Sequence, residues 1–343
     1  MAPVPRPRTR ILPAFLDGWR RVLGAPVIAA STLLATFVLA LPLALVMHDT
    51  IEAHLGSSLE AERAAAGWNA GWAAEFAAQA QGLGRTFTHE VIGFGGTLAI
   101  ISDIADREAL TPALAIAAAV SIALWVFLSG GILDRLARAR PVRAGHFFSA
   151  CGVYGIRFLR LAVLIGAAYW VLFRWVHPYL FGPLYHRLTR DLSEERDGMV
   201  VRGLLYLVFA AGVALVNLVA DFAKVRAVVE DRHSMIGAIG ASWRFIRRRK
   251  APVIGLYLLN VLAFLVILRL WLSLAPAAGE PTWFAFLLAE IYLLVRVWAR
   301  LAFMASEVAF FQSELAHAHY TAAPDPIWPD SPAVEGIENM TRL

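Results

Sequence analysis

The sequence predicts an all-α integral membrane protein with six transmembrane helices, cytoplasmic interfacial helices and an outer helical hairpin. Three observations support this fold class: six long apolar runs, a mean hydropathy of +0.61, and a charged fraction of only 17% over 343 residues. A helix rises about 1.5 Å per residue, so roughly 20 apolar residues cross a ~30 Å hydrocarbon core. The alternative, buried helices of a soluble protein, fits neither this hydropathy nor this charge.

Four of the six runs contain no charged residue: 26–47, 110–133, 203–220 and 251–268. The other two are interrupted. Run 161–185 contains Arg174, and run 281–296 contains Glu290. Both reach spanning length when the interruption is included, so we expect six spans.

Lys and Arg concentrate in alternate connections between the runs. They are dense before the first run, after the second (135–160) and after the fourth (224–250), and sparse in 48–111. Because positive residues remain on the cytoplasmic side, we expect both termini in the cytoplasm. The pI of about 9.6 therefore indicates anionic lipid at that face rather than nucleic acid.

Three short amphipathic segments precede the odd-numbered runs, at 15–23, 146–154 and 239–246. Aromatic and basic residues at helical spacing are typical of helices in the headgroup layer. Pro26 and Pro252 suit the first turn of the span that follows. These segments predict three repeats of interfacial helix, span and return span.

The predicted organisation has three parts. Residues 1–25 form a cytoplasmic N-terminus with an interfacial helix, 26–320 the membrane domain, and 321–343 a disordered cytoplasmic tail. The outer insertion 48–111 is predicted to be a helical hairpin, where Trp68, Trp72 and Phe76 would share one face. It either packs on the outer mouth of the bundle or acts as a lid for a substrate or partner.

Polar residues inside the predicted spans are candidate functional groups, because burying them in lipid is costly. These intramembrane candidates are Glu290, Arg174, Arg269, Arg296, Asn217 and Asn260. Similar depths favour an ion pair between Glu290 and Arg174, or Arg269 as the second choice. Otherwise the arginines reach toward the nearest interface.

Two further sets of residues lie at the predicted inner face. An anionic-lipid surface is expected from Trp243, Arg244, Arg247, Arg248, Arg249 and Lys250. Ion pairs that fix helix ends are expected for Asp134 with the basic run that begins at Arg135, for Asp221 with the run of Lys224 and Arg226, and for Glu307 after Arg300. The Ser-Gly-Gly sequence at 129–131 is expected to allow close helix packing.

No motif indicates a reaction. The single cysteine, Cys151, excludes an internal disulfide, and the histidines lack the spacing of a metal site. Neither a phosphate-binding glycine loop nor a nucleophile elbow occurs. We therefore expect no catalytic residue, metal or cofactor, and we favour a non-enzymatic role.

The segment Ala238-Ile-Gly-Ala-Ser242-Trp243-Arg244-Phe-Ile-Arg247 resembles the interfacial helices of a broad group of bacterial six-span inner-membrane proteins. That group includes the membrane domain attached to some glycerophosphodiester phosphodiesterases. Trp19-Arg20 is a looser match, and segments 131–135 and 221–232 resemble helix ends of the group. The resemblance implies the fold and a multi-pass location in the bacterial inner membrane. It implies no active site, and the chain carries no phosphodiesterase domain.

Three functions remain open from the sequence. The leading one is a membrane component that engages lipid or a membrane-protein partner. The second is a small transporter with a polar path near Glu290. The third is a lipid-modifying enzyme.

Overall fold

The computed structural model describes residues 11–66, 69–87, 112–192, 194–276 and 281–317. Within these ranges every regular element is a helix, which confirms the predicted all-α class. The long helices are α2 (Pro26–Leu55), α6 (Pro112–Arg138), α7 (Ala144–Val171), α10 (Glu195–Val229), α12 (Lys250–Leu274) and α13 (Thr282–His317). Two shorter helices, α1 (Ile11–Leu23) and α11 (Met235–Arg248), precede α2 and α12.

In the part of the chain that is described, five helical stretches are long and apolar enough to cross a membrane: Pro26–Leu55, Ala115–Arg138, Ala144–Thr189, Glu195–Val229 and Lys250–Leu274. Four of them contain the first, third, fourth and fifth predicted runs, and Ala115–Arg138 covers most of the second, 110–133. The sixth run lies in α13, which is not among the five and carries Glu290, Arg296 and Arg300. The span count of six therefore stays a prediction.

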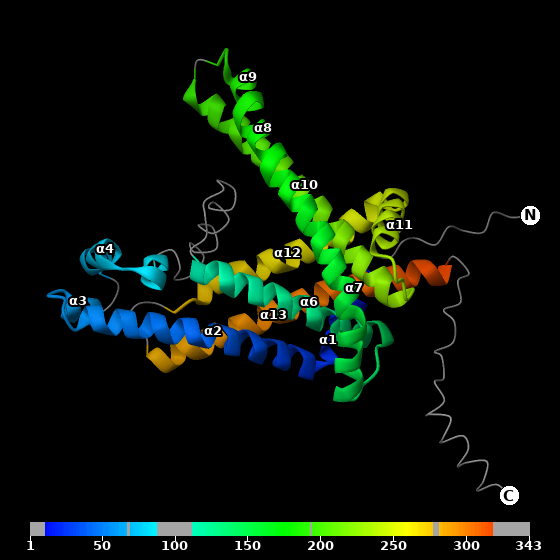
Figure 1. The fold of residues 1–343 in the computed structure, drawn as a ribbon, viewed down its shortest axis with the longest axis horizontal. Helices are drawn as coiled ribbons and strands as arrows, with labels where there is room; N and C mark the ends of the chain where they lie inside the picture. Colours follow the sequence, from blue (N-terminus) through cyan, green and yellow to red (C-terminus); the bar gives the residue numbers. More distant parts are fainter. Residues whose placement is uncertain (1–10, 67–68, 88–111, 193, 277–280, 318–343) are drawn as a thin grey trace, which may run out of the picture.

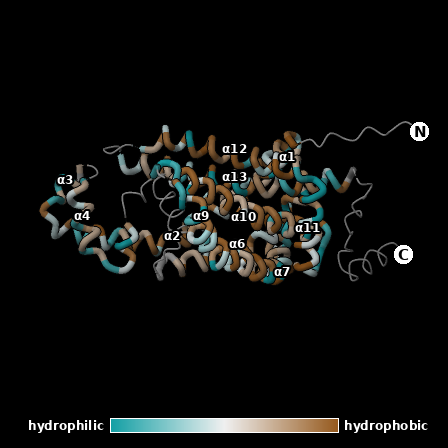
Figure 2. Tube along the Cα trace, turned by 90° about the horizontal axis from the view of Figure 1, so that it is seen from above, coloured by the Kyte–Doolittle hydropathy of each residue, from teal (hydrophilic) through white to brown (hydrophobic). Residues whose placement is uncertain are grey.

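Two groups of helices diverge from one end of the molecule. Helices α2, α6, α12 and α13 run in similar directions, with α13 in contact with the other three, whereas α7 and α10 form a long hairpin that contacts α6 at one end and leans away from there (Figure 1). The two groups meet where α1 and α11 lie. Hydrophobic residues follow the middle of the helices, and hydrophilic residues gather near α11 and near α3 (Figure 2).

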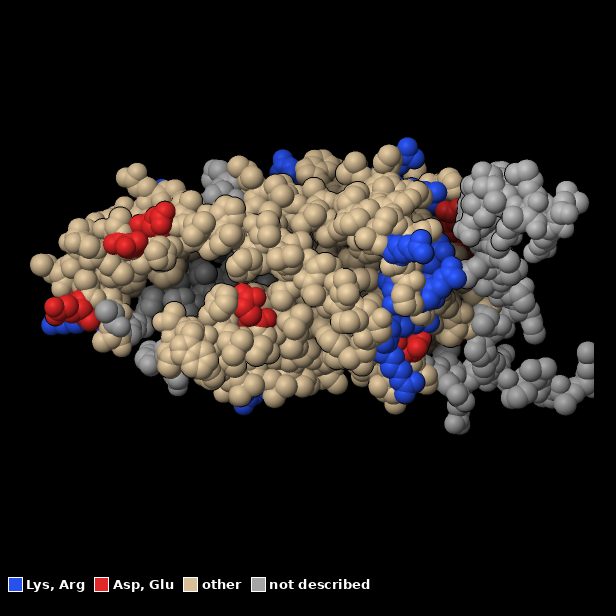
Figure 3. Space-filling model, turned by 90° about the horizontal axis from the view of Figure 1, so that it is seen from below, with Lys and Arg blue, Asp and Glu red and all other residues tan. Residues whose placement is uncertain are grey.

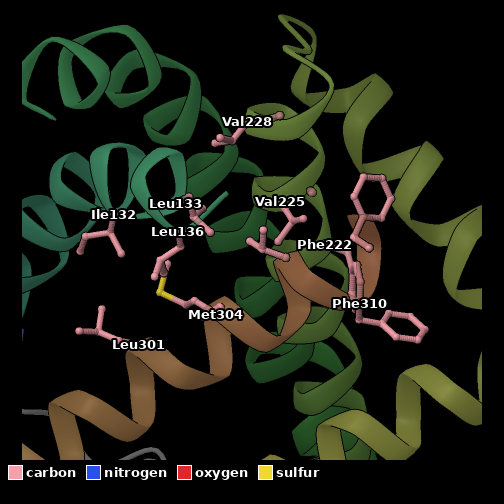
Figure 4. Packing of buried hydrophobic residues seen from close by; sticks show 14 of the residues in the cluster. Ile132, Leu133, Leu136, Phe222, Val225, Val228, Leu301, Met304 and Phe310 are labelled. Atoms are coloured by element: carbon pink, nitrogen blue, oxygen red, sulfur yellow. The ribbon is translucent and has the colours of Figure 1, made fainter. Parts of the chain in front are cut away.

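The main buried core lies at this meeting end rather than midway along the spans. It joins α1 and the start of α2 to the ends of α6, α10 and α13, the start of α7, and α11. In Figure 4, Met304 of α13 points toward Leu136 of α6, and Leu301 of α13 lies below Ile132 of α6. The second half of α13 is central to this core, since Ala302, Ala305 and Val308 are fully buried.

Glycines allow two of these helix contacts. A Cβ on Gly18 of α1 would lie 2.5 Å from the Ser306 amide nitrogen of α13. On Gly131 of α6, a Cβ would lie 2.6 Å from Cys151 Sγ of α7, and Gly130 is equally crowded by Tyr154. The predicted close packing at residues 129–131 is confirmed.

The predicted interfacial segments fold in two ways. The first and third become the separate helices α1 and α11, and Pro26 and Pro252 lie in the first turns of α2 and α12 as expected. The prediction was wrong for segment 146–154, which is continuous with the span that follows in α7. Only the first and third segments are followed by a proline that opens the next helix, and nothing interrupts the second.

The hairpin formed by α7 and α10 contains two π-helical turns, η3 (Leu172–Val176) and η4 (Leu180–Leu184). Between and after them lie α8 (His177–Tyr179) and α9 (Tyr185–Thr189). Pro178 and Pro183 lie within or beside these turns, and proline has no N–H for the regular helical ladder. The helix is therefore wider at these two turns, but the chain remains helical through Arg174.

The described part of the outer insertion is small. Residues 48–55 continue α2, followed by α3 (Ala61–Ala65), α4 (Ala70–Gln79) and η1 (Gly82–Thr86). Trp72 and Phe76 share one face, as predicted, and pack against the end of α2. Trp68, most of the second half of the predicted hairpin and the tail 321–343 lie outside the described residues.

Candidate functional site

Helix α11 has two chemically different faces. Its N-terminus is capped by Ser234, whose Oγ accepts a hydrogen bond from the Gly237 amide at 3.2 Å. One face is buried, with Ala238, Ala241 and Ile246 packed toward α10. The other face and the first residues after it are exposed: Trp243, Arg244, Arg247, Arg248, Arg249 and Lys250. We call these six residues the basic face of α11.

Most charges on the basic face of α11 have no protein counter-charge. Arg249 pairs with Glu314 of α13 at 2.7 Å. Within the described ranges, the side chains of Arg244, Arg247, Arg248 and Lys250 form neither an ion pair nor a hydrogen bond. Their charges are therefore available to an external anion.

The basic face of α11 belongs to a wider basic band. Figure 3 shows Lys and Arg gathered across one end of the molecule, the end that contains the main core. Arg20, from the segment before the first run, and Arg143 and Arg160, from connection 135–160, are also exposed. The connections that the sequence assigned to one side thus meet at one end.

Side-chain bonds hold the helices together beneath this band. The Arg21 guanidinium donates to Asp17 Oδ2 at 2.9 Å, to the Leu136 carbonyl at 2.9 Å and to Gln312 Oε1 at 2.8 Å, which links α1, α6 and α13. Arg135 donates to the Gly24 carbonyl at 2.8 Å. These arginines have structural roles and do not belong to the available charge.

The three predicted inner-face ion pairs have different outcomes. Asp221 pairs with Lys224 at 2.5 Å, as predicted. Asp134 pairs with Arg138 at 2.9 Å instead of Arg135, because residues four apart share a helix face and adjacent ones do not. The prediction for Glu307 was wrong: this buried carboxyl forms no ion pair within the described structure, and its Oε1 has no hydrogen-bond partner.

Glu290 does not form the predicted ion pair. Among the described residues no ion pair contains it, and its side chain is half-buried. Arg269 bonds to Ser273 of its own helix, and Arg174 lies exposed on the hairpin that leans away from α13 (Figure 1). For Arg174 matching depth was insufficient because the two helix groups diverge, whereas Arg269 lies on the neighbouring helix α12 but bonds within it.

The two amide candidates join helices. Asn260 of α12 donates to Ser306 Oγ of α13 at 3.0 Å, and Tyr169 of α7 donates to Asn217 Oδ1 of α10 at 2.6 Å. Hydrogen bonds between neighbouring helices satisfy polar groups that lipid cannot. The interhelical hydrogen bond therefore accounts for Asn217 inside a span. Asn260 makes such a bond too, and it also lines a cavity.

A cavity of about 550 Å³ lies between α2, α12 and α13. Its polar lining consists of Thr36, Asn260, Arg296 and Arg300. The sequence singled out Asn260 and Arg296 but treated Arg300 only as an ion-pair partner. Arg296 and Arg300 are four residues apart and share a face of α13, which is the signal that could have joined them. Glu290 does not line the cavity.

One further cluster of ligand-type atoms lies near the C-terminal end of α2. His48, Asp49 and Glu52 each place one such atom within 4.8 Å of the others. All three side chains are exposed and already interact with one another. An exposed acidic cluster of this kind does not define a metal site.

No protein-family model matches the chain, and comparisons with curated proteins and with solved structures find no significant match. The function must therefore be argued from the residues. The two arrangements that combine charge with accessibility are the basic face of α11 and the cavity between α2, α12 and α13.

Proposed function

We propose that this chain is a non-enzymatic integral membrane protein that binds anionic lipid at its basic end. In this proposal α13 supplies the sixth span, both termini lie in the cytoplasm, and the membrane is a bacterial inner membrane. The alternation of basic connections and the resemblance of residues 238–247 to inner-membrane interfacial helices support this topology.

The basic face of α11 is the observation that carries the proposal. It presents one exposed tryptophan and five exposed cations on a helix whose opposite face is buried in the core. Tryptophan favours the headgroup level, and each Lys or Arg near an anionic surface contributes about 1 kcal/mol. A helix docked in this way holds its charges in the plane of the headgroups.

The test removes charge at this face and, separately, at the opposite end. Arg244, Arg247 and Arg248 are replaced with Gln in one variant, and the exposed Arg187, Arg190 and Arg196 are replaced in the matched control. Arg249 is kept because it pairs with Glu314. Native mass spectrometry of each protein in neutral detergent measures the dissociation constant for phosphatidylglycerol.

The first variant should bind phosphatidylglycerol with about 3 kcal/mol less binding free energy, roughly a hundredfold weaker, because three arginines that contact the lipid headgroups have lost their charge. The control should bind like the parent protein, since its arginines lie at the far tip of the hairpin (Figure 1). Equal affinities in the two variants would refute the assignment to α11.

The transporter alternative near Glu290 gains no support from the structure. Glu290 does not line the cavity between α2, α12 and α13, and Arg269, one of its expected partners, bonds within its own helix. The charged lining of that cavity consists of Arg296 and Arg300.

A further inference from the structure

We propose that the cavity between α2, α12 and α13 is a binding site for the headgroup of an anionic lipid, whose phosphate or carboxylate is held by Arg296 and Arg300 and whose net negative charge offsets theirs. This site is separate from the basic face of α11 and does not depend on it. It would hold one lipid molecule in a defined place, whereas the α11 face contacts the lipid surface as a whole.

Arg296 and Arg300 each contact an aromatic ring, but neither has a counter-charge among the described residues. The Arg300 guanidinium lies 3.5 Å from the ring centroid of Trp125 on α6, and that of Arg296 lies 5.5 Å from the ring centroid of Tyr292. In the part of the chain that is described, neither forms an ion pair or a hydrogen bond. A guanidinium stacked on a ring keeps its in-plane N–H donors free for a bidentate oxyanion.

The cavity itself supplies no counter-charge. None of its lining residues is acidic, so two cations share one uncompensated space. The charge of Asp221 on α10 acts on Arg300 from beyond ion-pair distance, but Asp221 is already paired with Lys224 at 2.5 Å. An external anion is the group that would complete the site.

The remainder of the lining fits a lipid better than a small ion. Val261, Phe264, Leu293, Val297 and Phe303 give the cavity an apolar wall beside the arginines. Its volume of about 550 Å³ falls within the range of about 300–1,000 Å³ typical of small-molecule sites. The arginines of the cavity can bind the charged headgroup of a lipid, while its apolar wall can contact the acyl chains.

The depth of the cavity strengthens the argument. Thr36 and Asn260 each lie ten residues from the first residue of their helix, roughly 15 Å along α2 and α12. Charged side chains at such a depth are costly unless they pair. Both arginine side chains are exposed, so the cavity opens at the side of the bundle, where a lipid can enter.

The experiment places a photo-crosslinker at the cavity. p-Benzoylphenylalanine replaces Phe264, a lining residue that is partly exposed and therefore tolerant of change. The full chain is reconstituted in nanodiscs of phosphatidylcholine with a minor share of phosphatidylglycerol, irradiated, and the attached lipid identified by mass spectrometry. Phosphatidylglycerol should be attached roughly tenfold above its abundance, as expected for charge-assisted hydrogen bonds.

Three variants define the site. Replacing Arg296 and Arg300 with Gln should abolish the enrichment, whereas the matched Arg269→Gln, on a cation outside the cavity, should retain it. The double Lys variant, which keeps both charges, should retain part of it. If the Gln variant does not fold, the comparison of lipids on the parent protein still decides the question.

Two outcomes would overturn the proposal. Attachment of both lipids in proportion to their abundance would show that the cavity does not select anions. Displacement of phosphatidylglycerol by millimolar inorganic phosphate would assign the site to a free anion. The α11 variant lacking Arg244, Arg247 and Arg248 should keep the enrichment, so failure of either proposal can be distinguished from failure of the other.

Discussion

Two consecutive arginines of α1 have opposite environments. Arg21 is largely buried and bonds to three partners on three helices, whereas Arg20 is exposed. Both count equally in the charge asymmetry that orients a membrane protein. Only the structure separates a cation that holds helices together from one that faces outward.

Arg21→Ala should destabilise the protein by about 2–4 kcal/mol, because the Leu136 carbonyl and Gln312 lose their donor in a partly buried place. Arg20→Ala should stay within about 0.5 kcal/mol, as for other exposed residues without partners. Thermal unfolding in a fixed detergent measures both. Equal losses would mean that the α1–α13 link contributes little.

Gly18 provides a test of close packing. Gly18→Ala should lower stability by about 1–3 kcal/mol, since the new Cβ would lie 2.5 Å from the backbone of Ser306. Gly166→Ala, on α7 with no atom within 4 Å of its Cβ position, should be neutral or slightly stabilising. Protease accessibility of α1 should increase only in the Gly18 variant, and an increase in both would contradict the packing argument.

The sequence predicted only some of the polar residues that join helices or line the cavity. Hydropathy identified Asn260 and Arg296, because polar groups stand out in an apolar run. The pairing of Glu290 with Arg174 was predicted wrongly, since depth along a helix does not give the direction in which the helix leans. Arg300 was misassigned because its aromatic partner, Trp125, is distant in sequence.

At the scale of elements, the hairpin of α7 and α10 is longer than a bilayer needs. The stretch Ala144–Thr189 has 46 residues and α10 has 35, roughly 70 Å and 50 Å of helix, against a hydrocarbon core of ~30 Å. Its far end has its own small core of Leu180, Leu205 and Phe209. This end is therefore stabilised separately from the main core.

Phe209→Ala should loosen the far end alone. The substitution should lower the stability of this end by about 2 kcal/mol. This is less than the same change costs in the core of a water-soluble protein, because helices that separate in a membrane remain solvated by lipid. Hydrogen exchange should rise in residues 177–189 and stay unchanged around Val308. Leu207→Ala, at an exposed neighbour, is the control. Faster exchange throughout the protein would show that the two cores are coupled.

Apolar runs predicted where the helices lie but not where they end. Helix α13 continues to His317, well beyond the apolar run, because its second half is buried against α1, α6 and α10. Similarly, α7 includes segment 146–154, which was predicted to be a separate interfacial helix, because no proline follows that segment. Composition marks contact with lipid, whereas helix ends depend on contacts between elements.

At the scale of the whole molecule, the basic connections meet at one end, and this gathering followed from the alternation of charge. Single cysteines in a Cys151→Ala background test which side of the membrane that end faces. Position 57, exposed at the opposite end, should react with an impermeant thiol reagent on intact cells, and position 331 should not. Labelling at 331 without lysis would reverse the proposed orientation.

The contact between α1 and α13 has a consequence for biosynthesis. Arg21 and Gln312 are 291 residues apart, so the first described helix waits for the last one to be made. At roughly 5–20 residues per second, that interval is roughly 15–60 s. During this time α1 presents Ala14, Gly18 and Val22 without their partner, in a chain whose spans have already begun to enter the bilayer. Ribosomes stalled before α13 should therefore carry an N-terminus open to proteases and chaperones, and release of the finished chain should close it.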